Sequence, residues 1–284
     1  MKLNNFLLNP GLYIVSTPIG NLEDISSRAL KILNESHVIF CEDTRRSLKL
    51  LNYYKINKSL YSCHKFNERK VSEKIIQIIK EGKIVSLISD AGTPLISDPG
   101  QIVVNGCLDN NINVIPVPGP SAVNSAVSIS GFNEKYLFYG FLPKKKNEIN
   151  KILQELSSLN FSIVFFIPPK SINNYLNYFK KFFLERKILI AREMTKKFES
   201  FYRGALKDFK TFENNIKGEL TVVISNKKIE KKNLKKIDES VKIKIQNLLK
   251  KYSTKDVVEI ISKTENLSKN EIYKTCLNIL KKLK

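Results

Sequence analysis

The chain has 284 residues, which is enough for two domains or one large one. With 42% hydrophobic and 10% aromatic residues it can fill a sizeable core, so the composition excludes a disordered protein. The 48 Lys and Arg against 27 Asp and Glu give a net charge of +21. Such an excess of positive charge favours a polyanionic partner such as nucleic acid.

Three further features exclude membrane and metal-binding classes. The longest stretch without a charged residue, 110–133, contains three prolines and two glycines and does not fit a membrane-spanning helix. The N-terminal apolar run is too short for a signal peptide. No CxxC spacing joins the four cysteines, Cys41, Cys63, Cys107 and Cys276. We therefore predict a cytoplasmic protein without a membrane partner, disulfides or a metal site.

Short apolar runs predict four strands in the first part of the chain. These runs, expected to be buried on both faces, span residues 12–16, 37–41, 84–88 and 113–117. We expect a helix over 25–33 with Asp24 as its N-cap, and a second helix from the isoleucines of 75–79 that stops at Gly82. Alternation of strands and helices predicts a mostly parallel sheet covered by helices. Ligands of such sheets bind beyond the carboxyl ends of the strands.

A second set of apolar runs predicts a second α/β domain. The predicted strands span residues 136–141, 161–167, 187–191 and 220–225. Residues 227–284 instead read as Lys-rich helices with 17 Lys against 7 acids, and Ser268 and Glu271 have the spacing of a capping box. The predicted architecture is thus α/β, with domains at 11–119 and 120–226 and a small basic helical appendage at 227–284.

The segment 89–100, SDAGTPLISDPG, directly follows a predicted strand. Gly92 and Gly100 permit close backbone approach, and Asp90 and Asp98 supply hydrogen-bond acceptors. Two glycines, two prolines and two acids in twelve residues exceed what a connector needs, although a rigid structural turn is the alternative. We interpret this loop as one wall of a site for a small polar ligand.

Three other loops belong to the same sheet edge if the strands are parallel. They are 16–21 (STPIGN), 41–46 (CEDTRR) and 117–122 (VPGPSA). None matches GxGxxG or GxxxxGK[ST], which places NAD and ATP enzymes low on the list of functions. The CEDTRR segment brings acids and arginines to this edge, or is simply a helix start with acids in its first turn. The histidines His37 and His64 have no partner at metal-ligand spacing.

Seven segments occur in an order that resembles the ribosomal RNA small subunit methyltransferase I family, a branch of the tetrapyrrole methylase superfamily. They are STPIGNLEDIS, EDTRR, SDAGTPLISDPG, PVPGPSA, GFLP, AREMTKKFE and KGE. The resemblance covers residues 11–225, with a fainter match at 268–280. It departs from the family at 167–171, where IPPKS replaces a segment like ESPHR, and at Phe66, where the family has His.

The resemblance implies an S-adenosylmethionine-dependent 2'-O-methyltransferase that acts on a cytidine ribose in the decoding region of 16S rRNA. It also implies two α/β domains with the cofactor in the cleft between them, and a homodimer whose partner is 16S rRNA or the small ribosomal subunit. Carried over position by position, the cofactor contacts are Pro18, Ile19, Asp90, Gly92, Thr93, Pro94, Ile96, Ser121, Ala122, Ile167, Ala191 and Leu220.

A ribose hydroxyl is a very weak acid, so we expect a base or a cation beside it. The catalytic candidates are Glu42, Asp43 and Arg45. The substrate-binding candidates are Arg46, His64, Asn67, Asp98, Lys196 and Glu199. Two alternatives stay open: a small-molecule methylase of tetrapyrrole type, and a non-enzymatic RNA-binding assembly factor on the same fold.

Overall fold

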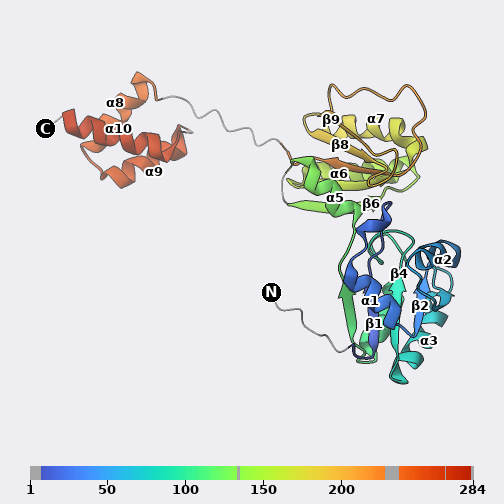
Figure 1. Cartoon of the computed structure of the whole chain (residues 1–284). Coiled ribbons are helices and arrows are strands. Elements are labelled where there is room, and N and C mark those ends of the chain that lie inside the picture. Colours follow the sequence, from blue (N-terminus) through green and yellow to red (C-terminus); the bar gives the residue numbers. More distant parts are fainter. Residues whose placement is uncertain (1–7, 133–134, 228–236, 266, 283–284) are drawn as a thin grey trace. The chain divides into compact units, whose positions relative to one another are not determined.

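The computed structural model describes residues 8–132, 135–227, 237–265 and 267–282. They belong to two compact units, Met1–Lys227 and Lys228–Lys284. The first unit contains two five-stranded sheets, which occupy separate halves of it in Figure 1. Among the described residues, no helix is long and apolar enough to cross a membrane.

The first sheet, predicted to be mostly parallel, is parallel throughout. Its order is β3-β2-β4-β1-β5, with all four neighbouring pairs parallel. The strands are β1 (Gly11–Val15), β2 (Val38–Cys41), β3 (Ser59–Ser62), β4 (Ile84–Ile88) and β5 (Val114–Val117). The carboxyl ends of parallel strands meet at one edge, so the loops that follow them are brought together.

Helices cover both faces of the first sheet. They are α1 (Ser27–Glu35), α2 (Thr44–Tyr53), α3 (Glu68–Lys80) and α4 (Gln101–Asp109). Alternate residues of β1 point to opposite faces, so that Tyr13 and Val15 pack with residues of α1 and α2, while Leu12 packs with residues of α3 and α4. The sheet is therefore the middle of three layers with a core on each side.

Two predicted details of the first sheet are wrong. The first helix begins two residues later than expected, because the hydroxyl of Ser26 and not Asp24 caps it, accepting from the Ala29 amide at 3.1 Å. Asp24 instead ends a short 3-10 turn, Leu22–Asp24. Strand β5 is only partly buried, with Pro116 exposed, because it is an edge strand that pairs with β1 alone.

The second sheet is mixed. Its order is β6-β7-β10-β8-β9, in which β6 and β7 are parallel and every other neighbouring pair is antiparallel. The strands are β6 (Tyr136–Phe141), β7 (Ser162–Ile167), β8 (Lys187–Arg192), β9 (Ser200–Ala205) and β10 (Leu220–Ile224). The carboxyl ends of β6, β7 and β8 and the amino ends of β9 and β10 therefore lie at one edge.

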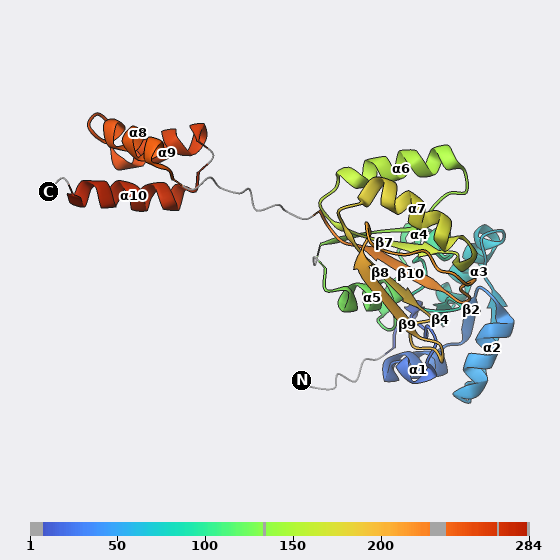
Figure 2. The same ribbon diagram turned by 90° about the horizontal axis from the view of Figure 1, so that it is seen from above.

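Helices also cover both faces of the second sheet, as Figure 2 shows. α6 (Lys146–Ser158) and α7 (Ile172–Phe183) pack on one face, where Phe165 and Phe179 stack at 5.2 Å between ring centres. α5 (Ala122–Ser130) packs on the other face. Ile19, from the loop after β1, packs into the core between α5 and the second sheet, so the two sheets share a hydrophobic contact.

The second unit consists of the helices α8 (Glu239–Leu249), α9 (Thr254–Thr264) and α10 (Lys269–Lys282). Asp238 and Ser253 cap α8 and α9, and α10 begins directly after Ser268, as the capping-box spacing predicts. The helices enclose a small core of their own, formed by Val241, Ile245, Val257, Ile261, Leu267, Ile272 and Cys276. The helical character predicted for this basic segment is confirmed for its described residues.

Candidate functional site

Three loops at the carboxyl edge of the first sheet are joined by hydrogen bonds. Thr17 and Gly92 exchange two backbone bonds, at 2.9 and 3.0 Å. The hydroxyls of Ser16 and Thr93 lie 2.9 Å apart, and Thr93 donates to the carbonyl oxygen of Pro120 at 3.2 Å. The loops after β1, β4 and β5 thus form one framework, as their common position after parallel strands predicts.

Several residues of loop 89–100 have positive φ angles, which residues other than glycine rarely adopt. Gly92 has φ +84°, and a Cβ there would lie 3.4 Å from Ile19. Leu95 and Ser97 also have positive φ, 70° and 69°, without being glycines. Strain of this kind is stored where the surrounding structure fixes it, and functional sites are its usual location.

A buried carboxylate holds the far end of this loop. Glu68, 6% exposed, accepts from the amide of Gly100 at 2.9 Å and from the amide of Ile102 at 2.7 Å. It thereby caps the start of α4 and fixes the loop that carries Asp98. Asn67 beside it is also structural, because its side chain accepts from the amide of His64 at 2.8 Å and donates to the carbonyl of Ser62 at 3.0 Å.

A cavity of about 450 Å³, here called the central cavity, lies between the loops of the first sheet and the edge of the second. From the first side it is lined by Ile19, Glu42, Arg46, Asp90, Ala91, Gly92, Thr93, Ile96, Ser97 and Asp98, and by Ser121, Ala122 and Val123 at the start of α5. From the second sheet it is lined by Phe141, Phe166, Ile167, Pro168, Pro169, Gly218, Glu219, Leu220 and Thr221. Its walls are therefore mainly apolar, with carboxylates and hydroxyls at defined places.

Carboxylates crowd one part of the central cavity. Burial, together with the negative charges of Glu42 and Asp90, raises the pKa of Asp98 to about 6, although a hydrogen bond from Ser89 opposes this. Burial and the charge of Asp90 likewise raise the pKa of Glu42. Asp90 itself pairs with Arg46 at 3.1 Å. Asp98, with its pKa of about 6, is thus suited to accept a proton near neutral pH, and Glu42 is shifted in the same direction.

Asp43 and Arg45 lie outside this cavity. The Asp43 carboxylate accepts from the Arg45 amide at 2.9 Å at the start of α2 and pairs with the Arg45 guanidinium at 2.7 Å. Hydrogen bonds from Arg45 lower the pKa of Asp43 to about 2. The Arg45 side chain is 87% exposed. The arrangement of this pair is that of a capped helix start.

A strained turn after β8 contacts the first loop. Glu193 and Thr195 have φ of 50° and 65°. The Lys196 ammonium group lies 3.1 Å from the Glu193 carboxylate and 2.9 Å from that of Glu219. Thr195 accepts from the amide of Asn21 at 3.0 Å. The turn therefore joins the second sheet to the loop after β1.

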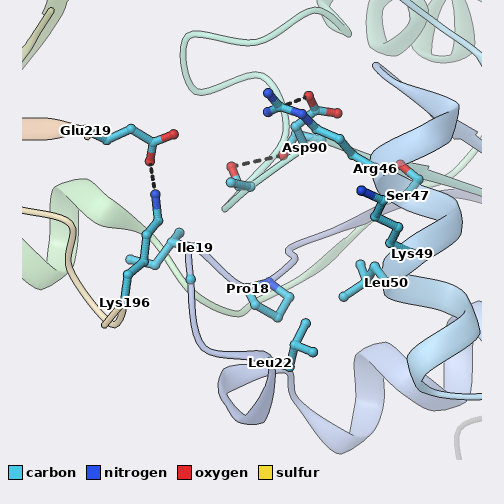
Figure 3. A pocket seen from close by; sticks show the side chains of 13 residues that line it. Pro18, Ile19, Leu22, Arg46, Ser47, Lys49, Leu50, Asp90, Lys196 and Glu219 are labelled. Carbon is cyan, nitrogen blue, oxygen red and sulfur yellow. Dashed lines mark hydrogen bonds and ion pairs between the residues drawn. The ribbon is translucent and has the colours of Figure 1, made fainter. Parts of the chain in front are cut away.

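A smaller cavity of about 310 Å³, here called the side cavity, adjoins the central one. Figure 3 shows Lys196 and Glu219 on one side of it and Arg46, Lys49 and Leu50 of α2 on the other. It is lined by Pro18, Ile19, Gly20, Leu22, Arg46, Ser47, Lys49, Leu50, Ser89, Asp90, Ala91, Lys196 and Glu219.

The structure brings most of the predicted site residues together. The central cavity includes Ile19, Glu42, Arg46, Asp90, Gly92, Thr93, Ile96, Asp98, Ser121, Ala122, Ile167 and Leu220. Pro18 and Lys196 line the side cavity. Lining neither cavity are Asp43, Arg45, His64, Asn67, Pro94, Ala191 and Glu199. Ala191 lies in the core beside α5, and Glu199 accepts from the amide of Thr195 at 2.6 Å.

Sequence reasoning missed several lining residues. Phe141, 58% exposed, follows Gly140, which has φ +83° at an irregularity in the pairing of β6 with β7. A bulge of this kind re-aims the next side chain, but only the register reveals it. Lys49 and Leu50 were missed although they follow Arg46 by three and four residues, the spacing that places side chains on one helix face.

Comparisons with known proteins identify the family of the chain. The family profile described as Tetrapyrrole (Corrin/Porphyrin) Methylases matches residues 11–210. A Thermotoga maritima protein named Ribosomal RNA small subunit methyltransferase I is 47% identical over 219 residues, covering 76% of this chain and 98% of that protein. A Rickettsia prowazekii protein of the same name is 42% identical, covering 94% and 96%.

Solved structures support the fold. A uroporphyrin-III C-methyl transferase from Thermus thermophilus, complexed with S-adenyl homocysteine, superposes with a TM-score of 0.54 at 13% identity. The superposition covers 76% of this chain and 97% of the other. At this identity the likeness extends to the arrangement of the two sheets and not to individual side chains.

Proposed function

The chain belongs to the tetrapyrrole methylase family, and from this premise we propose that it methylates the 2'-hydroxyl of a cytidine ribose in the decoding region of 16S rRNA. It is a methyltransferase, and S-adenosylmethionine is its methyl donor. The structural observation that carries the proposal is the central cavity, in which a pair of carboxylates lies at the edge of a ligand-sized, mainly apolar space.

The residues of the central cavity fit the methyl donor. Its volume of about 450 Å³ is in the range of sites for ligands of this size. Ile96, Phe166 and Leu220 offer apolar surface for an adenine ring, while the hydroxyls of Thr93 and Ser121 offer polar contacts. Gly92 has no side chain and has φ +84°, so a ligand can approach its backbone closely. Nearby carboxylates complement a cationic donor.

When bound, the cofactor supplies an activated methyl group, so the protein's task is alignment and removal of one proton. Methylation of a hydroxyl oxygen would release its proton, which a base of the protein must accept. We assign that role to the pair Glu42 and Asp98: burial raises the pKa of both carboxyl groups, and the Asp98 pKa of about 6 suits a base that works near neutral pH. Asp43, with its pKa of about 2, is the weaker base.

We propose that the C-terminal unit supplies affinity for RNA. Residues 227–284 carry 17 lysines against 7 acids, and Lys242, Lys250, Lys251, Lys255 and Lys274 are all exposed. Each lysine that reaches a phosphate releases counterions and steepens the salt dependence of binding. Removing 227–284 should weaken RNA binding and flatten its salt dependence while cofactor affinity survives. Equal loss of both affinities would instead assign the unit a role in folding.

We also propose a homodimer that works in the cytoplasm. The family resemblance supports both, and four free cysteines agree with a reducing compartment. Light scattering of the purified chain tests the dimer, and fractionation of cells that express the tagged protein tests the compartment.

One experiment separates the proposed function from its alternatives. The protein is incubated with radiolabelled S-adenosylmethionine and, in separate tubes, immature small ribosomal subunits, free 16S rRNA and a porphyrinogen. We expect label in the 2'-O-methyl group of one RNA cytidine. Label in the porphyrinogen alone would show a small-molecule methylase. Binding of cofactor and RNA without transfer to any acceptor would show an assembly factor.

A further inference from the structure

The side cavity shares one wall with the central cavity. The two share five lining residues: Ile19, Arg46, Asp90, Ala91 and Glu219. The Arg46–Asp90 ion pair, 3.1 Å long, therefore belongs to the wall between them. A molecule in the side cavity would present its near end at this wall, beside the space that contains Glu42 and Asp98.

The lining of the side cavity combines an apolar floor with positive charge. Pro18, Leu22 and Leu50 form the apolar part, and Figure 3 shows Pro18 and Leu22 close together, with Leu50 on the facing helix. The positive charges come from Arg46, Lys49 and Lys196. An apolar surface with cations around it suits the flat base and the phosphate of a nucleotide.

These three cations differ in whether a carboxylate of the protein neutralises them. Arg46 pairs with Asp90, and Lys196 lies between the carboxylates of Glu193 and Glu219. Within the described parts of the chain, Lys49 has no ion pair. A ligand anion would therefore interact with Lys49 without competing against a carboxylate of the protein.

We propose that the side cavity receives the nucleotide to be methylated, turned out of the RNA strand, with its base against Leu22 and Leu50 and its phosphate at Lys49. This inference rests on the proposed function. The volume of about 310 Å³ suits one nucleoside, and proteins that recognise single-stranded RNA splay its bases out of the stack and hold them against protein side chains. The ribose then lies at the Arg46–Asp90 wall, on whose other side the central cavity contains the proton-accepting pair.

The test uses three variants of the full-length protein. Lys49→Gln removes the unpaired charge, and Leu50→Trp fills the apolar part of the cavity. Lys31→Gln is the matched control, because Lys31 is an exposed lysine of α1 that lines neither cavity. Leu22→Phe is the second filling variant if the melting temperature of Leu50→Trp shows a folding defect.

Two binding measurements accompany the methylation assay. The first is the fluorescence of an RNA fragment with pyrrolo-cytidine at the position that the wild-type protein methylates, since unstacking of this base raises its emission. The second is calorimetric binding of S-adenosylhomocysteine, which reports on the central cavity. Both are recorded without the methyl donor, so neither depends on turnover.

We expect Lys49→Gln to raise the KM for RNA about fivefold and to leave kcat within twofold, because it removes one phosphate contact. Leu50→Trp should abolish the fluorescence rise and lower kcat/KM at least tenfold. Neither variant should change S-adenosylhomocysteine affinity more than twofold, and Lys31→Gln should change the KM less than twofold.

Two results would overturn the inference. One is a Leu50→Trp protein, or its Leu22→Phe replacement, with wild-type fluorescence and turnover. The other is a tenfold loss of S-adenosylhomocysteine affinity in that protein, which would make the side cavity part of the donor site. Failure of the proposed function is a separate outcome, since it would appear as a wild-type protein that binds cofactor and methylates no RNA.

Discussion

The two sheets of the first unit contribute to the site in different ways. All five strands of the first sheet run in one direction, so every loop after a strand lies at the same edge, and these loops carry Glu42, Asp90 and Asp98. The second sheet is mostly antiparallel and supplies apolar side chains such as Phe166 and Leu220. The parallel topology of the first sheet gathers its polar loops at one edge, whereas the mixed second sheet supplies an apolar wall of the central cavity.

The charged groups of the two sheets also differ: carboxylates of the first line the central cavity, whereas a buried arginine beside the second is held by hydrogen bonds within the protein. Burial and the charge of Asp90 raise the pKa of both Glu42 and Asp98, and the charge of Glu42 further raises the pKa of Asp98, so negative charges repel one another at this edge. Arg186, beside the second sheet, is 4% exposed and donates to four carbonyl oxygens, those of Ser157, Leu159, Phe161 and Ser225. Substitutions on the first sheet should therefore change catalysis, and substitutions on the second should change stability.

The largest effect is expected at Asp98. Asp98→Asn keeps the shape of the side chain and removes the base, so kcat should fall about 10²- to 10⁴-fold. Affinity for S-adenosylhomocysteine, measured by calorimetry, should stay within threefold. The control is Asp109→Asn at the exposed end of α4, which should turn over at the wild-type rate. A kcat for Asp98→Asn within fivefold of wild type would remove Asp98 from the proton-accepting pair.

The same residue predicts opposite pH trends for rate and stability. The reactive form is the carboxylate, so kcat should rise through pH 6, where Asp98 ionises. Because its folded pKa of about 6 exceeds the ordinary 3.8, the native state binds the proton more tightly. Stability from this group is full below pH 3.8 and is lost as the pH rises to 6. Asp98→Asn should therefore melt above wild type at pH 8 and level with it at pH 4.

The largest effect on stability is expected at Arg186. Arg186→Met leaves four carbonyl oxygens without their donor in a buried place, which should lower the free energy of unfolding by about 3 kcal/mol. Thermal melting should detect a fall of roughly 6–12 °C. Lys187→Met, at the exposed neighbouring position, is the control. If the folded Arg186→Met protein lost kcat at low temperature, the division between the sheets would fail.

A smaller effect is expected where the two sheets meet. A Cβ at Gly20 would lie 2.4 Å from Lys196 Cγ and 3.0 Å from the backbone oxygen of Met194, so Gly20→Ala must push the strained turn away from the first loop. We expect the dissociation constant for S-adenosylhomocysteine to rise about tenfold, or about 1.4 kcal/mol. The control is Ser27→Ala, at an exposed position of α1. Unchanged cofactor affinity would show that this contact does not shape the central cavity.

The sequence predicted the interior strands well because buried strands are continuous apolar runs. All eight predicted strands exist, with ends within one residue. Of the four edge strands, β5 and β6 are apolar runs and were predicted, whereas β3 (SLYS) and β9 (SFYRGA) were missed because polar residues shorten or interrupt their apolar runs. The antiparallel pairing of the second sheet could not be predicted from the sequence either, since it depends on contacts between segments that are distant in the chain.

Loop positions in the site followed from chain order, but side-chain directions did not. Asp98 and Glu42 follow strands and reach the cavity, as expected of polar residues at that edge. Asp43 follows β2, as Glu42 does, and yet caps α2, because its carboxylate accepts a hydrogen bond from the amide of Arg45 in the first turn of the helix. Which of two adjacent acids points into a cavity is decided by local hydrogen bonds, and composition carries no record of them.

The smallest effect is expected at Glu68, which acts on the first sheet's loop without lining either cavity. Glu68→Gln keeps an acceptor for the amides of Gly100 and Ile102 but loses the charge that strengthens both bonds. A loss of about 1 kcal/mol in loop order should appear as a three- to fivefold lower kcat, with the pH midpoint near 6 retained because Asp98 is intact. Glu73→Gln, exposed on the same helix, controls for charge. A shift of the pH midpoint in Glu68→Gln would instead place Glu68 in electrostatic contact with the base, and the contrast between positioning and proton transfer would have to be redrawn.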